Sequence, residues 1–195
     1  MTTRQIKRHG HLIVVSAPSG TGKTTLCKAL LQHYPDIVYS ISTTTRSPRK
    51  GEKDGVDYHF MEKECFIEKL KDHCWAEWAQ VHGNYYGTSA AFLDQTLASG
   101  RDILLDIDVQ GTRQILKRYP GAITVFILPP SLKVLRERLE KRRTDSRETI
   151  EKRMQNAEEE ISHQNLYRHV IINDRLSAAK KELIDIVGSY REKQH

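Results

Sequence analysis

The sequence predicts an α/β fold with a five-stranded, mostly parallel sheet, helices on both faces and a smaller inserted α+β lobe. Short apolar segments rich in β-branched residues alternate along the 195 residues with segments of helical periodicity. A glycine-containing loop joins the first apolar segment to the first helical one. The expected strands are residues 12–16, 37–42, 103–108, 123–128 and 169–174.

The first strand and the first helix flank a candidate phosphate-binding loop. Leu12 to Val15 form an apolar, β-branched run that is typical of a buried parallel strand. The next residues fit the pattern G-x-x-x-x-G-K-[ST], except that Ala17 stands at the first glycine position. Because alanine tolerates a positive φ poorly, we expect Ala17 to keep a conformation that a Cβ allows. The helix is predicted from Leu26, Leu30, Leu31 and Tyr34 at helical spacing.

Such a loop binds phosphate with its backbone N–H groups and with the positive end of the helix that follows. Lys23 can reach the outer phosphates of a nucleotide, and the Thr24 hydroxyl can ligate Mg²⁺. The alternative is an ordinary strand–turn–helix corner that contains Gly-Lys-Thr by chance.

Length and cysteine content limit the class of protein. The chain suffices for one α/β core, and no apolar run approaches the ~18 residues of a membrane span. The basic N-terminus precedes only a short apolar run, which fits a first strand better than a signal peptide. Cys27, Cys65 and Cys74 are odd in number and lack metal-type spacing, so we expect free or buried thiols in a reducing cytoplasm.

The formal net charge of +6 could indicate nucleic acid, a membrane surface or small anionic substrates. Nine lysine or arginine residues lie between Lys133 and Arg153, but five acidic residues are interleaved with them. Mixed signs on a helix usually form a solvated face with i,i+4 ion pairs. We therefore do not expect nucleic-acid binding.

A polar segment, Ser42 to Arg49, follows the second expected strand and is too polar for a core element. Arg46 and Arg49 lie three residues apart in it, and arginine is suited to holding phosphate with two hydrogen bonds. The alternative, about equally weighted, is a solvated loop in which the arginines have no ligand.

Residues 50–92 predict a small lobe attached to the core. A turn at residues 51–55 precedes a short strand at 57–61 and a helix at 62–72 that buries Phe66 and Leu70. A second strand is expected at residues 75–81, before a turn at 82–84. A helix at residues 90–99 then ends at Gly100.

The strand at residues 103–108 ends in Asp106 and Asp108, which would lie on one side of it. Open α/β sheets bind ligands at the carboxyl ends of their strands, where a carboxylate can help to hold Mg²⁺. The alternative is that these carboxylates cap the next helix.

The last third of the chain predicts two helices, a strand and a closing helix. Ser131 is a candidate N-cap of a helix with the apolar stripe Leu132, Leu135 and Leu139. Residues 144–148 could form a hinge into a second helix that extends to Glu160. After the last expected strand, a helix at residues 178–190 buries Leu183, Ile186 and Val187.

Six segments in this order resemble the guanylate kinase family, from about His11 to Tyr190. They are SAPSGTGKTT, STTTRSPR, GVDYHF, WAQVHGNYYGT, LDIDVQG and IIND. Each segment is weak alone, whereas all six together are highly specific. The family also carries alanine at the first loop glycine.

The resemblance implies an enzyme that phosphorylates GMP, and also dGMP, with ATP and Mg²⁺ in purine nucleotide metabolism. It implies one domain of three parts: a core (1–41, 93–134 and 161–195), a GMP-binding lobe (42–92) and a lid (135–160). The implied ATP-binding residues are Ala17, Pro18, Ser19, Gly20, Thr21, Gly22, Lys23, Thr24, Thr25 and Asn173.

The implied GMP-binding residues are Ser42, Arg46, Arg49, Tyr58, Glu77, Tyr86, Thr88 and Asp106. Of these, the arginines and tyrosines would hold the phosphate, and Glu77 and Thr88 would read the guanine. Thr24 and, through water, Asp108 would hold Mg²⁺, although the division of roles between Asp106 and Asp108 stays open. The implied catalytic residues are Lys23 and the lid arginines Arg138, Arg142 and Arg153.

Three other functions compete with this interpretation. Residues 108–111 fit the D-x-x-G pattern of GTP-hydrolysing switches, but no asparagine is followed by lysine, as their N-K-x-D motif requires. Guanylate-kinase-like modules of scaffold proteins bind phosphopeptides without catalysis. A kinase for another small phosphorylated acceptor would not need the pair Glu77 and Thr88. We expect an enzyme with small-molecule substrates, no membrane or nucleic-acid partner, and an oligomeric state that the sequence leaves open.

Overall fold

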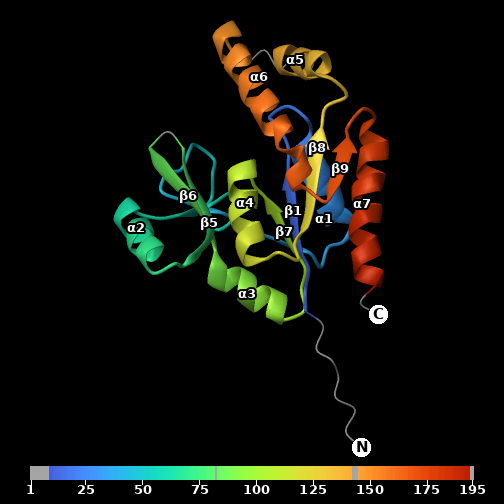
Figure 1. Cartoon of the computed structure of the whole chain (residues 1–195). Coiled ribbons are helices and arrows are strands. Elements are labelled where there is room, and N and C mark those ends of the chain that lie inside the picture. The colour runs from blue at the N-terminus through green and yellow to red at the C-terminus, as the bar shows by residue number, and fades with distance from the viewer. Residues whose placement is uncertain (1–8, 82, 142–144, 194–195) are drawn as a thin grey trace, which may run out of the picture.

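A five-stranded parallel sheet forms the centre of the computed structural model, which describes residues 9–81, 83–141 and 145–193 (Figure 1). The strand order is β2-β7-β1-β8-β9. The strands are β1 (Leu12–Ser16), β2 (Val38–Tyr39), β7 (Ile103–Asp106), β8 (Ile123–Leu128) and β9 (His169–Ile172). The predicted fold class is therefore confirmed. The strands at 37–42 and 103–108 are shorter than predicted, because the chain leaves the sheet at its carboxyl edge.

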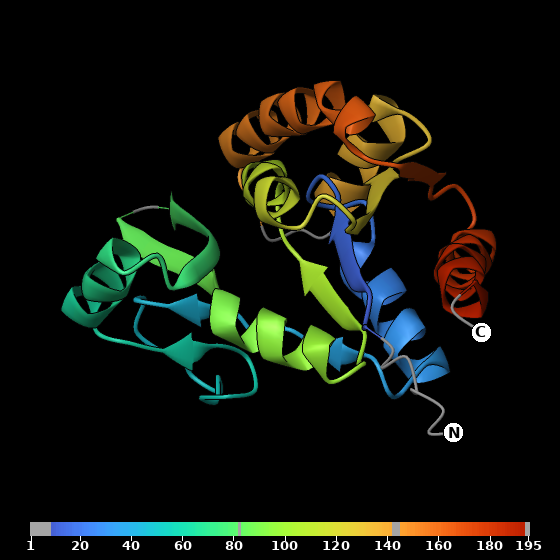
Figure 2. The same ribbon diagram turned by 60° about the horizontal axis from the view of Figure 1, so that its bottom comes forward.

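Helices cover both faces of this sheet (Figures 1 and 2). The side chains of β1 alternate between the two layers, as a strand requires. Ile13 and Val15 pack in one apolar cluster with α1 and α7, whereas Leu12 and Val14 pack in another with α3 and α4. These helices are α1 (Lys23–His33), α7 (Leu176–Glu192), α3 (Ala90–Ala98) and α4 (Val109–Arg118).

A second sheet lies beside the core and belongs to the inserted lobe (Figure 2). It has four strands in the order β4-β3-β6-β5, whereas we predicted two strands and a helix. Helix α2 buries Phe66, which stacks on Trp75. The elements are β3 (Thr43–Thr44), β4 (His59–Phe60), α2 (Lys63–Lys71), β5 (Trp75–Val81) and β6 (Asn84–Ser89).

The prediction that residues 42–49 are too polar for a core element is wrong at β3, where Thr43 and Thr44 are buried. β3 pairs with β4 in parallel and with β6 in antiparallel orientation. The Thr44 hydroxyl donates to the Tyr85 carbonyl at 3.1 Å and accepts from the Arg46 N–H at 3.2 Å. Threonine can be buried here because its hydroxyl has partners.

Two helices, α5 (Leu132–Lys141) and α6 (Arg147–Ser162), form the predicted lid segment. Leu135 and Leu139 pack with residues of α6, but Leu132 is 38% exposed and does not extend the apolar stripe. We expected i,i+4 ion pairs here, but none forms among the described residues of these two helices; their ion pairs join separate segments. Arg136 pairs with Glu151 between the two helices, at 2.6 Å.

The strand at 123–128 and the helices at 90–99 and 178–190 form close to their predicted bounds. The last strand ends at Ile172 rather than at residue 174, and Leu70 and Ile186, which we predicted to be buried, are only half-buried. A 3₁₀ turn at Gln164–Leu166 connects α6 to β9. The three cysteines are free, and Cys27 is buried. Among the described residues, no helix is both long enough and apolar enough to cross a membrane.

Candidate functional site

The candidate phosphate-binding loop lies between β1 and α1, as predicted. Gly20 and Gly22 have φ values of 95° and 96°. Among the described residues, His73 is the only non-glycine residue with a positive φ, so Ala17 keeps an ordinary conformation, as expected. A Cβ on Gly20 would also lie 2.9 Å from Leu139 Cδ2, so a side chain there would meet helix α5. The glycines therefore allow both the loop geometry and its close approach to the lid.

Asn173, which directly follows β9, is hydrogen-bonded to this loop. Its Nδ2 donates to the Thr21 carbonyl at 2.6 Å, and a Cβ on Gly22 would lie 2.7 Å from that nitrogen. The Asn173 carbonyl accepts from Arg138 Nη2 at 2.9 Å, and its Oδ1 is buried with no hydrogen-bond partner in the described part of the chain. One asparagine thus connects the loop to helix α5, while its predicted position near adenine stays a prediction.

A cavity of about 370 Å³ opens above the loop. Lys23, at the start of α1, forms an ion pair with Asp106 at the end of β7. Two carboxylates from other elements, Asp108 and Glu160, also face this cavity. Its lining residues are Ala17, Pro18, Ser19, Gly20, Gly22, Lys23, Thr24, Thr25, Asp108 and Glu160.

Asp106 and Asp108 do not share one strand, which corrects the prediction. β7 ends at Asp106, and Asp108 is the N-cap of α4, where its Oδ1 accepts from the Gly111 N–H at 2.8 Å. The capping alternative is thus right for Asp108. This carboxylate also lines the loop cavity, so capping fixes a side chain that faces a possible ligand.

A second cavity, of about 300 Å³, lies between the lobe and the core. Five residues predicted to bind GMP line it together: Ser42, Tyr58, Glu77, Tyr86 and Asp106. Asp108 lines both cavities, and Lys23 of the first pairs with Asp106 of the second. The two cavities therefore meet at the carboxyl end of β7.

Glu77 is a buried carboxylate of β5 and is only 6% exposed. The Thr88 hydroxyl, from the neighbouring strand β6, donates to its Oε1 at 2.6 Å. Burial raises the pKa of Glu77 to about 7, and the charge of Asp108 acts in the same direction against the Thr88 hydrogen bond. A Cβ on Gly111 would lie 2.9 Å from Glu77 Oε2, so a larger residue there would have to displace this carboxylate. The predicted pair of Glu77 and Thr88 is thus one hydrogen-bonded unit.

Arg46 lies beside the two tyrosines of the lobe cavity. Its guanidinium carbon is 5.4 Å from the centre of the Tyr58 ring, and its Nη1 donates to the Ser47 carbonyl at 2.8 Å. Its Nη2 pairs with Glu52, a residue that the sequence interpretation missed. Neither predicted arginine is among the residues that line this cavity. Arg49 is exposed, and its backbone N–H donates to the same carboxylate at 2.8 Å. A carboxylate three residues after the second arginine is the signal that could have identified Glu52.

Of the predicted lid arginines, Arg138 and Arg153 are described, and neither lines the loop cavity. Arg138 contacts Asn173, and Arg153 Nη1 pairs with Asp145 at 3.2 Å. Arg142 lies outside the described residues. The phosphate contacts expected of these arginines stay predictions.

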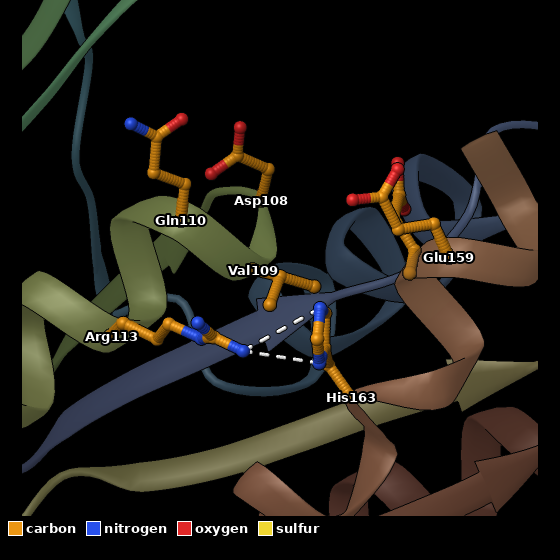
Figure 3. Close-up of a pocket in the computed structure, with 7 residues that line it drawn as sticks. Asp108, Val109, Gln110, Arg113, Glu159 and His163 are labelled. Atoms are coloured by element: carbon orange, nitrogen blue, oxygen red, sulfur yellow. Dashed lines mark hydrogen bonds between the residues drawn. The ribbon is translucent and has the colours of Figure 1, made fainter.

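The sequence interpretation also missed the junction of α4 and α6, which Figure 3 shows. Arg113 of α4 and His163 at the end of α6 are joined at 3.1 Å, beside Asp108 and Glu159. Burial raises the pKa of Glu160 to about 7, although Lys23 acts in the opposite direction. Glu160 lines both this junction and the loop cavity, so helix α6 contributes a carboxylate to the site.

The residues of the loop cavity fit a magnesium ion that is bound together with phosphates. Thr24 offers a hydroxyl oxygen, and Asp108 and Glu160 offer carboxylates in the same cavity. Within the described ranges, no group of three or more His, Cys, Asp or Glu residues could hold a metal by itself. Mg²⁺ usually binds through one or two carboxylates, substrate phosphates and water, which agrees with this sparse set.

Comparison with known proteins identifies the family. The family model of guanylate kinase matches residues 9–190. A guanylate kinase of Nitrosospira multiformis is 49% identical over 184 residues, which cover 94% of this chain and 88% of that protein. A guanylate kinase of Shewanella violacea is 50% identical over 93% of this chain and 88% of that protein. The crystal structure of guanylate kinase from Anaplasma phagocytophilum superimposes with a TM-score of 0.74 at 32% identity, covering 94% of this chain and 87% of that one. The chain therefore belongs to the guanylate kinase family.

Proposed function

We propose that this chain transfers the γ-phosphoryl group of ATP to GMP, so that ADP and GDP are formed. The observation that carries the proposal is the meeting of two different cavities at the end of β7. One is built from a phosphate-binding loop and Lys23, and the other contains a buried carboxylate and two tyrosines. A phosphate donor and a phosphorylated acceptor can thus meet with their phosphates adjacent.

Glu77 provides the proposed recognition of guanine. Guanine presents two adjacent donors, N1–H and the N2 amino group, and an ionised carboxylate presents two acceptors and no donor. Adenine has an unprotonated N1 at the corresponding position, so it would meet the carboxylate acceptor to acceptor. The Thr88 hydroxyl already donates to Glu77 Oε1, which fixes the orientation of the carboxylate before the base enters.

Arg46, Tyr58 and Tyr86 would hold the GMP phosphate on the other side of the cavity. Ser42 and Asp106 complete the proposed acceptor site, and Arg49 would approach from the exposed loop. We also propose dGMP as an acceptor. The proposed setting is purine nucleotide metabolism in the cytoplasm.

Phosphoryl transfer needs positioning and positive charge rather than covalent help from the protein. The GMP phosphate is itself the nucleophile, so no side chain has to accept a proton. Lys23, which pairs with Asp106 here, would turn to the outer phosphates of ATP. Mg²⁺ would be held by Thr24 and, through water, by Asp108, and it would neutralise charge on the transferred group. Arg138, Arg142 and Arg153 would close over the site and exclude water.

Release of ADP from ATP and Mg²⁺ tests this proposal with GMP, dGMP, AMP, CMP and UMP as separate acceptors. We expect kcat/KM for GMP to exceed that for AMP by about 10⁴-fold, because a site built to hydrogen-bond one base leaves buried groups unpaired with the other. Glu77→Gln should lower kcat/KM for GMP by at least about 10²-fold, or 2.7 kcal/mol, with AMP little changed.

The exposed carboxylate Glu64 in helix α2 offers a matched control, and Glu64→Gln should leave the acceptor preference unchanged. Equal use of GMP and AMP would contradict the proposed base recognition. An absence of ADP release with every acceptor would favour a binding module over an enzyme.

A further inference from the structure

Glu52 closes the loop that carries both arginines of the lobe. Its two carboxylate oxygens lie 2.9 and 3.0 Å from Arg46 Nη2, and its Oε2 accepts from the Arg49 N–H at 2.8 Å. The Glu52 N–H donates to the Arg49 carbonyl at 3.0 Å. One residue therefore binds the guanidinium of the first arginine and the backbone of the second.

We propose that Glu52 is a positioning residue for the phosphate of the acceptor, which it serves by orienting Arg46. This inference rests on the proposed function, in which the lobe cavity holds GMP. Arg46 is held on three sides: by Glu52, by the Ser47 carbonyl and by the face of the Tyr58 ring. The hydrogen bond to Glu52 raises the pKa of Arg46 above its ordinary value and lowers that of Glu52, and Tyr86 also contributes to the shift of Arg46.

Two opposing effects decide the direction in which Glu52 changes phosphate binding. Its negative charge reduces the attraction between Arg46 and a phosphate. Its hydrogen bonds, however, fix an arginine side chain that would otherwise lose about 2 kcal/mol of rotamer entropy when it binds. The carboxylate occupies one guanidinium nitrogen, and an arginine carries five N–H donors, so donors remain for the ligand.

We take orientation to be the larger effect, because solvent reduces the electrostatic penalty. The side chains of Arg46 and Glu52 are 15% and 20% exposed, so solvent still reaches both and weakens part of the repulsion between Glu52 and a bound phosphate. Orientation of the guanidinium is not screened, and it is set before the ligand arrives. Glu52 therefore strengthens the binding of a phosphorylated acceptor.

A comparison of the affinities for GMP and for guanosine distinguishes a role of Glu52 in phosphate binding from a general effect on the structure of the lobe. Guanosine has the same base and sugar but no phosphate, and it is measured as a competitive inhibitor at millimolar concentrations. Glu52→Gln keeps the shape of the side chain but places an amide donor among the donors of Arg46 and Arg49. We expect its dissociation constant for GMP to rise at least about tenfold, whereas that for guanosine stays within about twofold of the wild type.

A double-mutant cycle tests whether Glu52 acts through Arg46. In the Arg46→Ala background, Glu52→Gln should change the GMP dissociation constant by less than about twofold, because the group that it orients is gone. Glu68→Gln removes an exposed carboxylate of the same lobe and should leave GMP binding unchanged.

Three results would overturn the inference. GMP binding that is unchanged or tighter in Glu52→Gln would show that the carboxylate only competes for the arginine. Equal weakening of GMP and guanosine, or additive effects in the cycle, would make Glu52 a structural residue of the lobe. A wild-type protein that does not use GMP would instead overturn the proposed function, and the acceptor assay detects that separately.

Discussion

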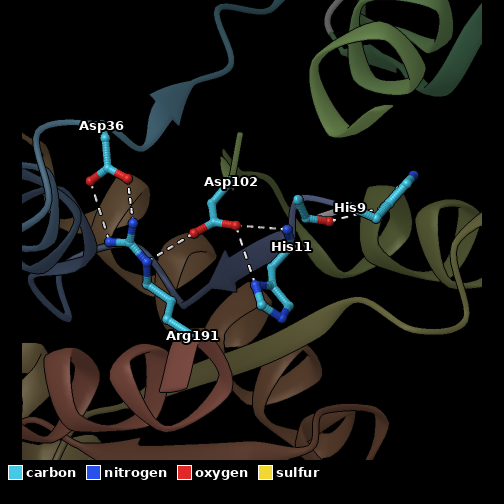
Figure 4. A network of polar contacts seen from close by, with 6 residues as sticks. His9, His11, Asp36, Asp102 and Arg191 are labelled. Carbon is cyan, nitrogen blue, oxygen red and sulfur yellow. Dashed lines mark hydrogen bonds and ion pairs between the residues drawn. The ribbon is translucent and has the colours of Figure 1, made fainter. Parts of the chain in front are cut away.

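The two ends of the central sheet carry two kinds of charged cluster. At the amino end, the buried carboxylate of Asp102 accepts from the His11 N–H at 2.8 Å and pairs with Arg191 Nε at 3.1 Å (Figure 4). Arg191 in turn pairs with Asp36 and lies 4.5 Å from the centre of the Tyr34 ring. This cluster fastens the end of α7 to the strands and to the loop after α1.

The cluster at the carboxyl end is less well compensated. Lys23 pairs with Asp106, but Asp108, Glu160 and the buried Glu77 also gather there. Burial raises the pKa of both Glu77 and Glu160 to about 7, as expected of carboxylates whose lost hydration is not fully replaced. The charges at the amino end are thus matched within the fold, whereas we propose that those at the carboxyl end are held for ligands.

The largest effect on activity is expected from Lys23→Ala, at the carboxyl end of the sheet. We expect kcat to fall by about 10²- to 10³-fold, because removing one preorganised charge from a transferring group has an effect of that order. The free energy of unfolding should change by less than about 1 kcal/mol, since Lys23 and Asp106 are partly exposed. Steady-state kinetics and urea unfolding measure the two effects.

Lys28→Ala removes an exposed lysine from the same helix and is the matched control, with kcat expected to stay unchanged. If Lys23→Ala kept more than about a tenth of the wild-type kcat, the proposed role of Lys23 would be wrong.

Asp102→Ala should have the opposite effect, lowering stability while leaving activity almost unchanged. The substitution leaves Arg191 and the His11 N–H without a buried carboxylate, so we expect the free energy of unfolding to fall by about 3 kcal/mol. Values of kcat and KM at 20 °C should stay within about twofold of the wild type, because this cluster lies at the far end of the sheet.

Asp94→Ala is the matched control, since Asp94 pairs with Arg118 on the surface and should lose less than about 1 kcal/mol. A drop in kcat for Asp102→Ala without a loss of stability would remove the distinction between the two ends.

A smaller effect is expected at the lid. Arg153 pairs with Asp145 here, so its proposed contact with the phosphates requires the lid to rearrange. Arg153→Ala should lower kcat about tenfold and raise KM for GMP by less than threefold, the pattern of a contact made mainly in the transition state. Arg136→Ala, which removes an ion pair on the same pair of helices, should leave kcat unchanged. A change in KM alone for Arg153→Ala would place this arginine on a solvated face.

The parts of the fold that depend on local sequence could be predicted. Leu12 to Val15, the glycines at 20 and 22 and the apolar spacing after Lys23 lie within one continuous segment, so the strand, loop and helix follow from it. The gathering of Ser42, Glu77 and Asp106 in one cavity could be predicted only through the family resemblance that six short motifs carry together, because these residues come from distant segments.

The features that could not be predicted depend on contacts between segments that are distant in the sequence. The sequence alone places Thr43 and Thr44 in a loop, because the strands β4 and β6 that pair with them on both sides come from other segments. The capping of α4 by Asp108 depends on where β7 ends, and the Arg136–Glu151 pair depends on how two helices cross. Periodicity within one segment gives no information about such contacts.

The pH dependence of unfolding of the wild type and Glu77→Gln tests directly whether the carboxylates at the carboxyl end of the sheet lack compensation within the fold. The pKa of Glu77 is about 7 in the folded protein and 4.5 without burial, so the folded state holds this proton more tightly. Its contribution to stability is therefore fully present below pH 4.5 and is lost as the pH rises through about 7, by about 3 kcal/mol in total.

Glutamine does not ionise, so the variant does not undergo this loss. We predict that the free energies of unfolding of the two proteins agree near pH 4.5, and that Glu77→Gln is the more stable one at pH 8. A variant that is less stable than the wild type at pH 8 would show that the carboxylate stabilises the fold, which would contradict the claim that this end of the sheet holds its charges for ligands.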